Sequence, residues 1–326
     1  MNYSVLSPEC GKTVTLLRPE HTAFLDDPSI IDDENADPPF PDLRDSDLST
    51  PMPLQIVYEP AEDTDVLLST DPDPASGILL KGKNGLAYAD NLLIGQKYYL
   101  RAGSGKNLSE PVSFTTFGRP PRLLSIEGVY NARDAGGWMT KSGRRVKQGI
   151  VFRTGELDVH SRITEYGKRQ LADLGVRTEL DVRAPDESCG SVMDEYGIQY
   201  VNIPLSAYDD AFRPDVMVAY RNSYRLLLDH PLPILIHCWG GIDRTGTWIF
   251  LLNGMLGVSE DDLLADYEFS GFTVWGKRSR SSDNVKMFLE KLMELSPDIQ
   301  TSCRTYMKNC GLSEEEIDRI TDLLLD

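Results

Sequence analysis

The 326-residue sequence lacks the features of several classes of protein. Its apolar runs are all much shorter than the roughly 18–20 residues of a membrane helix, and its first residues lack the basic start and apolar stretch of a signal peptide. Lys and Arg number 33 against 51 Asp and Glu, for a net charge of −18, which disfavours contact with nucleic acid or anionic lipid. We therefore expect a soluble protein that binds no nucleic acid, and both a cytoplasmic and an exported location stay open.

Metal-binding and disulfide patterns are also missing. The chain has five Cys and four His, with no Cys-x-x-Cys pair and no His cluster. Cys303 and Cys310 stand seven residues apart on a predicted helix and are expected to fill a core. The sequence thus predicts neither a bound metal nor a cofactor.

The first 120 residues contain short β-type runs between Pro, Gly, Asp and Asn, at residues 13–17, 54–58, 65–68, 97–101 and 112–116. This spacing predicts a small all-β antiparallel sandwich over residues 1–120. Residues 26–50 are acidic and rich in Pro, with nine acidic residues and four prolines between 26 and 47. We expect this stretch to be a solvated loop of the sandwich.

From residue 121 onward, strand and helix patterns alternate. Strands are predicted at 149–153, 178–183, 199–204 and 233–237, and helices at 164–174 and 214–229. Such alternation predicts an α/β domain over 121–326, with a central, mainly parallel sheet flanked by helices. Ligands of such sheets bind beyond the carboxyl ends of the strands.

The stretch HCWGGIDRTG (237–246) follows the last of these strands. Gly240 and Gly241 allow a tight turn whose amides point inward, and the next helix adds the positive end of its dipole. Arg244 supplies a planar pair of donors for two phosphate oxygens. We therefore predict an oxyanion site formed by Cys238, Trp239, Gly240, Gly241, Ile242, Asp243, Arg244 and Thr245.

Cys238 begins this turn. The inward amides, the helix dipole and the guanidinium all favour the thiolate, which is the nucleophilic form of cysteine. Thr245 is expected to donate a hydrogen bond to the sulfur. These features together predict nucleophilic catalysis on a phosphate ester.

His237, Cys238, five residues, Arg244 and Thr245 resemble the signature loop of the cysteine-dependent protein tyrosine phosphatases. NARDAGG (131–137), IVFRTGEL (150–157), LADLGVRTELDVRAPDE (171–187), LGVSEDDLLADYEFS (256–270) and GLSEEEIDRITDLLL (311–325) follow the order seen in the atypical bacterial tyrosine or dual-specificity branch. That resemblance implies a metal-free mechanism through a phosphocysteine. It also suggests that Arg133 and Asp134 support the loop, together with His237.

One residue of the loop departs from the resembled branch. Ile242 stands where that branch usually carries Lys, which weakens the case for highly charged phosphoinositide substrates.

In the first half of the chain, GQKYYLRA (95–102) and SEPVSFTT (109–116) resemble a fibronectin type III or immunoglobulin-like module. A module of that kind is expected to bind another protein or a glycan.

Protonation of the leaving group requires an acid. Asp243 lies inside the loop, whereas Asp209 and Asp210 follow the strand at 199–204, where many members of the superfamily carry a mobile acid loop. Both locations stay open. The basic run at 277–280 either attracts a phosphorylated substrate or is a solvated helix edge.

The sequence therefore predicts a phosphomonoester hydrolase for a phosphorylated protein or a small phosphomonoester. A soluble inositol phosphate phosphatase and a non-catalytic phosphate-binding module are the alternatives. Because every predicted site residue lies in the second half, a fragment of residues 121–326 is expected to fold and to be active.

Overall fold

The computed structural model describes residues 3–43, 46–73, 77–105 and 107–326, and these form two compact units. The first unit comprises residues 1–18 and 51–122, and the second comprises residues 19–50 and 123–326. The chain therefore passes from the first unit into the second, returns to the first, and then completes the second. The boundary at 122 lies close to the predicted boundary at 120.

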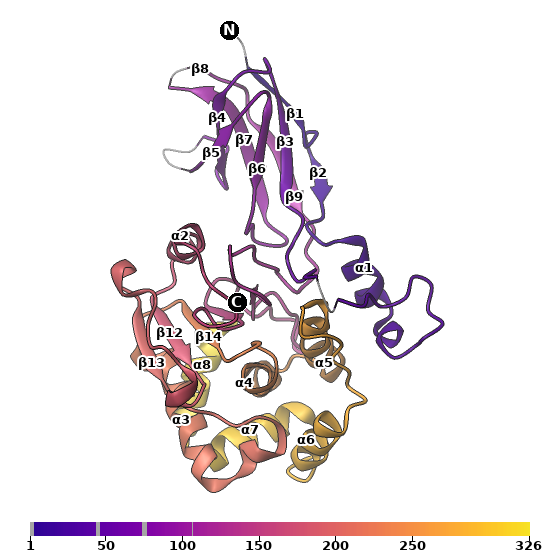
Figure 1. Ribbon diagram of the computed structural model, residues 1–326, viewed down its shortest axis with the longest axis vertical. Coiled ribbons are helices and arrows are strands. Elements are labelled where there is room, and N and C mark those ends of the chain that lie inside the picture. Colours follow the sequence, from indigo (N-terminus) through magenta and orange to yellow (C-terminus); the bar gives the residue numbers. More distant parts are fainter. Residues whose placement is uncertain (1–2, 44–45, 74–76, 106) are drawn as a thin grey trace. The chain divides into compact units, whose positions relative to one another are not determined.

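The first unit consists of strands in two sheets (Figure 1). One sheet has the order β1-β3-β6, and the other has the order β2-β9-β7-β4-β5 with β8 paired to β7. The bounds are β1 (Ser4–Ser7), β2 (Lys12–Val14), β3 (Leu54–Glu59), β4 (Thr64–Ser69), β5 (Ile78–Gly82), β6 (Leu86–Ala89), β7 (Lys97–Ser104), β8 (Asn107–Leu108) and β9 (Val112–Thr116).

One apolar core joins the two sheets of this unit. In β3, residues 54, 56 and 58 are buried while 55 and 59 are exposed, which is the period of two expected of a strand with one face on a core. Ile56 of one sheet and Leu100 and Phe114 of the other belong to the same core cluster. The five predicted strands are found here, but β2 and β9 run parallel, so the pairing is not wholly antiparallel as predicted.

The second unit contains a five-stranded sheet with the order β10-β11-β14-β12-β13. Strands β11 to β14 are parallel, and β10 is antiparallel to β11. The bounds are β10 (Arg133–Asp134), β11 (Val151–Thr154), β12 (Thr178–Asp181), β13 (Gln199–Asn202) and β14 (Ile234–His237). This sheet is the mainly parallel one that the sequence predicted.

Helices cover both faces of the sheet (Figure 1). The helices of the second unit are α1 (Pro19–Asp26), α2 (Glu165–Asp173), α3 (Pro214–Asp229), α4 (Asp243–Leu256), α5 (Glu260–Glu268), α6 (Asp283–Met293), α7 (Ile299–Cys310) and α8 (Glu314–Leu324), with short 3-10 helices η1 (Pro28–Ile31), η2 (Pro185–Glu187), η3 (Asp194–Tyr196), η4 (Tyr208–Phe212) and η5 (Phe269–Phe272). Ile234 and Ile236 of β14 pack in the core with α3, α4 and α7, whereas Leu235 packs with Leu171 of α2. Cys303 and Cys310 lie in the first of these cores, as predicted.

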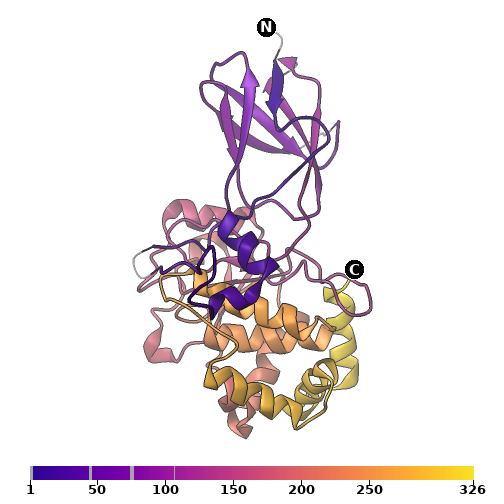
Figure 2. The same cartoon turned by 90° about the vertical axis from the view of Figure 1, so that its right-hand side faces the viewer.

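Residues 19–50 belong to the second unit, so the prediction that the acidic stretch of residues 26–50 is a loop of the sandwich is wrong. Most described residues of this stretch are exposed or half-buried, but Ile31 and Leu43 are buried. The surrounding charged residues conceal these apolar positions from a reading of local composition. Both views of the structure show α1 beside α5 (Figures 1 and 2).

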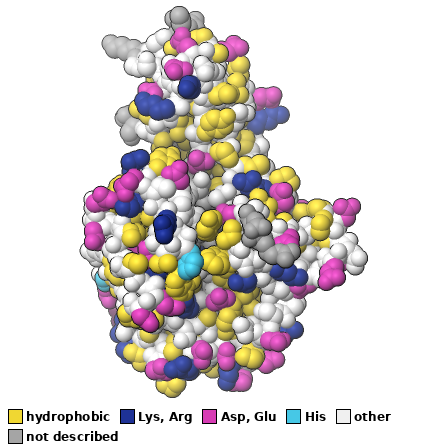
Figure 3. Space-filling model, in the orientation of Figure 1, with side chains coloured by type: hydrophobic (Ala, Val, Ile, Leu, Met, Phe, Trp, Pro, Cys, Tyr) yellow, Lys and Arg dark blue, Asp and Glu magenta, His cyan; other side chains and the backbone are white. Residues whose placement is uncertain are grey.

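Charged side chains are mixed on the surface. On the face drawn in Figure 3, Lys and Arg side chains are interspersed with Asp and Glu. None of the helices in the described part of the chain is long and apolar enough to cross a membrane.

Candidate active site

The phosphate loop, defined here as residues 238–245, connects the central strand β14 to helix α4. β14 lies between β11 and β12, so its carboxyl end is at the middle of the sheet edge where ligands of parallel sheets bind. α4 begins at Asp243, which places the positive end of the helix at the loop. Cys238 is 3% exposed and is the first residue of the loop.

Three successive carbonyl groups of the loop are bound from outside. The oxygen of Trp239 accepts from the Glu156 amide at 2.8 Å. The oxygens of Gly240 and Gly241 accept from Asn131 Nδ2 at 2.9 and 3.2 Å. Because the C=O and N–H of a trans peptide point in opposite directions, the amides of residues 240, 241 and 242 point inward. Inward-pointing amides are the donors that the predicted anion site requires.

Gly241 is required by the fold of the loop. Its φ is +65°, and a Cβ at this position would lie 2.0 Å from the carbonyl oxygen of Thr154. Any side chain would therefore collide with strand β11. Ile242, in place of the usual Lys, is 2% exposed and packs in the core, so it presents no charge to a ligand.

Arg244 is bound by Glu187, a residue at the end of η2 that the sequence analysis quoted but did not assign. Arg244 NH1 donates to Glu187 Oε2 at 2.6 Å, and Trp239 Nε1 donates to Glu187 Oε1 at 2.7 Å. Burial opposes ionisation of Glu187, but the bonds from Arg244, Trp239 and the Ala184 amide outweigh it and lower its pKa to about 2. Glu187 thus stays charged and orients both loop side chains.

Buried ions lie behind the loop. Arg153 NH2 donates to the Gly241 oxygen at 2.6 Å, and its NH1 donates to Asp266 Oδ2 at 2.5 Å. Arg133 Nε donates to the other oxygen of Asp266 at 2.8 Å. Burial and the nearby charge of Arg133 lower the pKa of Arg153 to about 10. For Asp266, burial acts to raise the pKa, but the two guanidiniums outweigh it, so the pKa is lowered.

Arg133 and Asp134 have different positions. Arg133 contacts Asn131, which binds the loop, and Asp266, which binds Arg153. Asp134 instead accepts from the amides of Gly136 at 2.8 Å and Gly149 at 2.6 Å, so it stabilises a turn before β11. The structure places only the first of this pair next to the residues that hold the loop.

His237 points into the sheet below the loop. Its Nε2 lies 2.9 Å from Glu179 Oε1, and burial alone would lower its pKa. The bond and charge of Glu179, together with Asp181, reverse this and raise the pKa. Glu179 therefore holds His237 at the end of β14.

Asp243 accepts a short hydrogen bond from the hydroxyl of Tyr208. Tyr208 also lies 2.8 Å from the hydroxyl of Tyr267, and its backbone has a φ of +56°, which is rare for a residue with a side chain. Burial and the adjacent Asp243 carboxylate raise the pKa of Tyr208, which keeps it a hydrogen donor. Tyr208 belongs to the stretch SAYDD in which the sequence analysis singled out only the acids.

Asp209 and Asp210 lie in η4 beside Tyr208. Asp210 has a side chain 62% exposed, and its carboxylate is 3.9 Å from Arg213. Asp209 is half-buried. Between the two predicted acid locations, the hydrogen bond from Tyr208 ties Asp243, not Asp209 or Asp210, into the site.

The predicted bond from Thr245 to the sulfur is not formed. Thr245 is fully buried, and among the described residues its hydroxyl has no hydrogen-bond partner. The first turn of α4 encloses this side chain in the core. Proximity in sequence was not sufficient to predict the direction of the hydroxyl.

Aromatic side chains border the loop. The rings of His160 and Trp239 are 4.6 Å apart in an edge-to-face arrangement, and His160 is 5.8 Å from Trp275. Arg183, held by Asp158 and Asp181 at 2.8 Å each, lies 5.6 Å over the Trp239 ring. Of these residues, only Trp239 was predicted from the sequence as part of the site, because His160, Arg183 and Trp275 come from separate segments.

The basic run at 277–280 is paired within the second unit. Lys277 binds Asp32 at 3.0 Å, and Arg280 binds Glu268 at 2.8 Å. Arg278 NH1 donates to the backbone oxygens of Trp275 and Lys277. Most of this charge is thus engaged internally. Across the described ranges, the side chains of His, Cys, Asp and Glu form no group of three or more suited to a metal ion.

The second unit is similar to known phosphatases. The model of the tyrosine phosphatase family matches residues 124–326. A Cupriavidus necator protein that bears a tyrosine-protein phosphatase name is 30% identical over 170 residues, covering 44% of this chain and 61% of that protein. The chain thus spans less than two thirds of that relative. The Mycobacterium tuberculosis triple specificity protein phosphatase PtpB is 26% identical over 228 residues, covering 55% of this chain and 79% of that protein.

Among solved structures, the core catalytic domain of a PP-IP phosphatase from S. cerevisiae aligns with a TM-score of 0.32 and 18% identity. It covers 46% of this chain and 88% of that chain. A TM-score of this size supports no conclusion about fold or function.

Proposed function

Because this chain belongs to the tyrosine phosphatase family, we propose that it hydrolyses phosphomonoesters through a phosphocysteine intermediate. One observation carries the proposal. Cys238 begins a loop whose carbonyl groups are bound on the outside by Asn131, Arg153 and Glu156, so the inner side offers amides to a phosphate. Such donors stabilise charge that develops on phosphate oxygens in the transition state.

In the proposed first step, Cys238 Sγ attacks phosphorus and forms the S–P bond while the bond from phosphorus to the ester oxygen breaks. The departing oxygen takes a proton from Asp243. In the second step, the Asp243 carboxylate takes a proton from water, whose oxygen attacks phosphorus and expels the thiolate. The products are the alcohol or phenol and inorganic phosphate, and both residues return to their starting state.

Arg244 has the role of binding two phosphate oxygens. Its bond to Glu187 uses NH1, so the guanidinium is already oriented before a substrate arrives. Orientation before binding reduces the entropy lost in the transition state. The ionised Glu187 also adds negative charge near the anion site, which the loop amides and the helix dipole offset together with Arg244.

Asp243 is the acid in this proposal, with Tyr208 as its positioning residue. The bond from Tyr208 occupies Oδ1, which leaves Oδ2 to carry the transferable proton. Asp209 and Asp210 remain the alternative, because they follow Tyr208 directly in η4.

The proposed substrates are phosphorylated proteins, with phosphotyrosine favoured by the aromatic rings of His160, Trp239 and Trp275 beside the loop. The name of the M. tuberculosis relative supports a broader specificity that includes other phosphoesters. Ile242 is apolar and buried, so this position supplies no cation for the additional phosphates of an inositol phosphate. For the first unit we propose a fibronectin-like binding module, supported by its two sheets around one core.

The test is hydrolysis of p-nitrophenyl phosphate and of a tyrosine-phosphorylated peptide, with Cys238→Ser as the comparison. We expect turnover by the wild type in EDTA, and complete loss in Cys238→Ser with vanadate binding retained, because serine does not ionise there while the amides and Arg244 remain. Undiminished turnover by Cys238→Ser would refute the cysteine mechanism. Activity that EDTA removes and a divalent cation restores would refute its independence of metal.

A further inference from the structure

The segment of residues 19–50 is attached to the second unit by aromatic packing. His21 and Phe24 of α1 are fully buried. The His21 ring lies 4.9 Å from Phe269 and 4.8 Å from Phe272 of η5, and Phe24 lies 5.7 Å from Phe272. Phe40 lies 4.8 Å from Phe272. These contacts fix the segment on η5, whose Ser270 hydrogen-bonds Asn131 and Arg133, the residues that hold the loop.

Ser49 is the part of this segment that comes nearest to the loop. It is 2% exposed, and its hydroxyl accepts the backbone N–H of Asn131 at 3.0 Å and donates to Asp47 at 2.8 Å. The neighbouring Leu48 donates its amide to the Phe272 oxygen at 2.9 Å. Ser49 is therefore held on both sides and presents a fixed acceptor to Asn131.

Asn131 transmits this contact to the phosphate loop. Its φ of +61° lies in the left-handed region, which Asn adopts more readily than most residues with a side chain. Its Nδ2 donates to the oxygens of Gly240 and Gly241, the carbonyls whose outward direction leaves the amides facing inward. Ser49 therefore holds the backbone of the residue that orients two loop peptides.

A second contact of the segment lies near the loop. Asp32 binds Lys277 at 3.0 Å and accepts from Ser279 Oγ at 2.5 Å. Lys277 follows Trp275 by two residues, and a Cβ on Gly240 would lie 3.2 Å from Trp275 Cδ1. Asp32 thus holds the chain just after Trp275, whose ring lies next to Gly240 of the loop.

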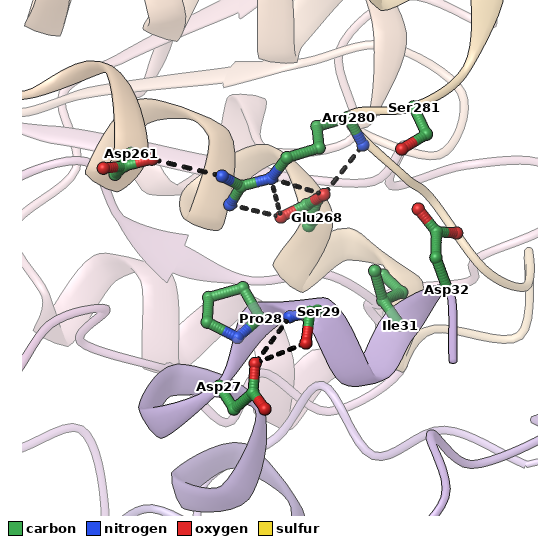
Figure 4. A pocket seen from close by; sticks show the side chains of 9 residues that line it. All are labelled: Asp27, Pro28, Ser29, Ile31, Asp32, Asp261, Glu268, Arg280 and Ser281. Atoms are coloured by element: carbon green, nitrogen blue, oxygen red, sulfur yellow. Dashed lines mark hydrogen bonds and ion pairs between the residues drawn. The ribbon is translucent and has the colours of Figure 1, made fainter. Parts of the chain in front are cut away.

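Other contacts of the segment lead away from the loop. A cavity of about 580 Å³ lies between η1 and α5 (Figure 4). On one side Ser29 donates to Asp27 at 2.6 Å, and on the other Arg280 binds Glu268 at 2.8 Å. Like Ser49, Ser29 donates its hydroxyl to the Asp two residues before it in the chain. Ser29 is exposed, however, whereas Ser49 is buried against Asn131. The chain thus contains a matched control for Ser49.

We propose that residues 19–50 form a built-in positioning element of the phosphate loop, and that Ser49 is its positioning residue, acting through Asn131. The inference rests on the proposed function in so far as the loop binds a phosphoryl group. Loss of the Ser49 hydroxyl leaves the buried Asn131 N–H without its acceptor and lets the two loop carbonyls turn. The transition state requires this alignment more than the ground state does.

The experiment uses the full chain with Ser49→Ala and Ser29→Ala. Affinities for orthovanadate, which takes the five-coordinate geometry of the transition state, and for inorganic phosphate are measured by tryptophan fluorescence, alongside kcat and KM for p-nitrophenyl phosphate and the melting temperature. We expect Ser49→Ala to weaken vanadate binding about 10-fold and phosphate binding about 2-fold, with kcat reduced more than KM is raised. Ser29→Ala should leave both affinities unchanged.

Coupling tests the route. Asn131→Gly accommodates the positive φ but removes the side-chain amide that binds the loop carbonyls. Adding Ser49→Ala to it should therefore not weaken vanadate binding further. If Ser49→Ala does not fold, Ser49→Thr keeps the hydroxyl and should bind vanadate as the wild type does, whereas Ser49→Cys, a weak acceptor, should not.

The proposal is overturned if Ser49→Ala and Ser29→Ala bind vanadate equally, or if Ser49→Cys matches the wild type. A loss of melting temperature with an unchanged vanadate-to-phosphate ratio also overturns it, because that is the result of a purely structural role. Wild-type protein that binds vanadate but hydrolyses no phosphoester would refute the proposed function instead, and the comparison of Ser49 with Ser29 would still be readable.

Discussion

The two units differ in what they bury. Among the described residues of the first unit, Arg122 is the only charged residue that is buried. It donates to the backbone oxygens of Leu92 and Asn91. The second unit buries many more titratable side chains, among them Arg133, Asp134, Arg153, Glu156, Glu179, Asp181, Arg183, His237, Asp266 and Glu268. Buried ion pairs seldom stabilise a fold more than apolar packing would.

The location of these charges explains their presence. Arg153 and Asn131 bind loop carbonyls, and Asp266 joins Arg153 to Arg133. An apolar core of the same volume could not hold carbonyl groups outward, since each would lose its hydrogen bond at a cost of about 1–3 kcal/mol. The difference between the units therefore marks the second as the one shaped by a site.

The largest expected effect comes from dividing the chain between the units. A fragment of residues 123–326 lacks the segment 19–50 and exposes Phe269 and Phe272, which are fully buried in the whole chain. We now expect this fragment to aggregate and to lose vanadate binding, contrary to the activity expected from the sequence of 121–326. Thermal melting and vanadate titration measure both effects.

The matched chain keeps residues 19–50 and replaces 51–122 by a Gly/Ser linker. Ser49 contacts Asn131, and the Leu124 amide bonds the Ala132 oxygen, so the two ends lie close and about six residues, with a reach of about 20 Å, suffice. This chain should retain wild-type vanadate affinity. Full activity of 123–326 alone would show that the segment is dispensable.

Arg244→Lys should be nearly as damaging as Arg244→Ala, with kcat/KM lowered about 10²- to 10³-fold in both. A point charge cannot make the two-pronged contact to phosphate, nor keep the same bond to Glu187. The half-exposed Arg213, paired with Asp215, provides the control, because Arg213→Lys should leave kcat/KM unchanged. Wild-type turnover in Arg244→Lys would remove Arg244 from phosphate binding.

Asp243→Asn should slow phenyl phosphate about 10²-fold and p-nitrophenyl phosphate much less, because a poor leaving group depends more on the acid. Tyr208→Phe should show the same contrast at a smaller size. Asp209→Asn and Asp210→Asn are the controls, and both should affect the two esters equally. A contrast at Asp209 or Asp210 and not at Asp243 would move the acid to η4.

The smallest effect is expected at Glu187. Its pKa is lowered from 4.5 to about 2, so its bond to Arg244 stabilises the fold above pH 4.5 and is lost as the pH falls through about 2. Glu187→Gln should change kcat/KM only about 3-fold, since the pair is partly exposed. Urea unfolding should give a constant difference from the wild type above pH 4.5 that decreases below it. A difference that varies between about pH 6 and 8 would contradict the lowered pKa.

Local pattern was sufficient to predict the strand-turn-helix geometry of the loop. The strand, the two glycines and the helix start lie within about ten residues, so hydrophobic runs and the conformational freedom of Gly241 predict their geometry directly. The parallel sheet followed from the alternation of strands and helices for the same reason. Ile31 and Leu43 were missed because nearby charges dominate the composition of residues 26–50.

The sequence by itself thus determined the order of the sheet-forming segments and singled out Cys238 and Arg244, the proposed nucleophile and phosphate-binding residue, since each depends on neighbours in the chain. Only the tertiary structure decided the partners: Glu187 for Arg244, 57 residues apart; Tyr208 for Asp243, 35 apart; and Ser49 for Asn131, 82 apart. Contacts over such separations depend on how whole elements pack, and no local propensity specifies them. For that reason the residues that hold the loop became visible only in the folded chain.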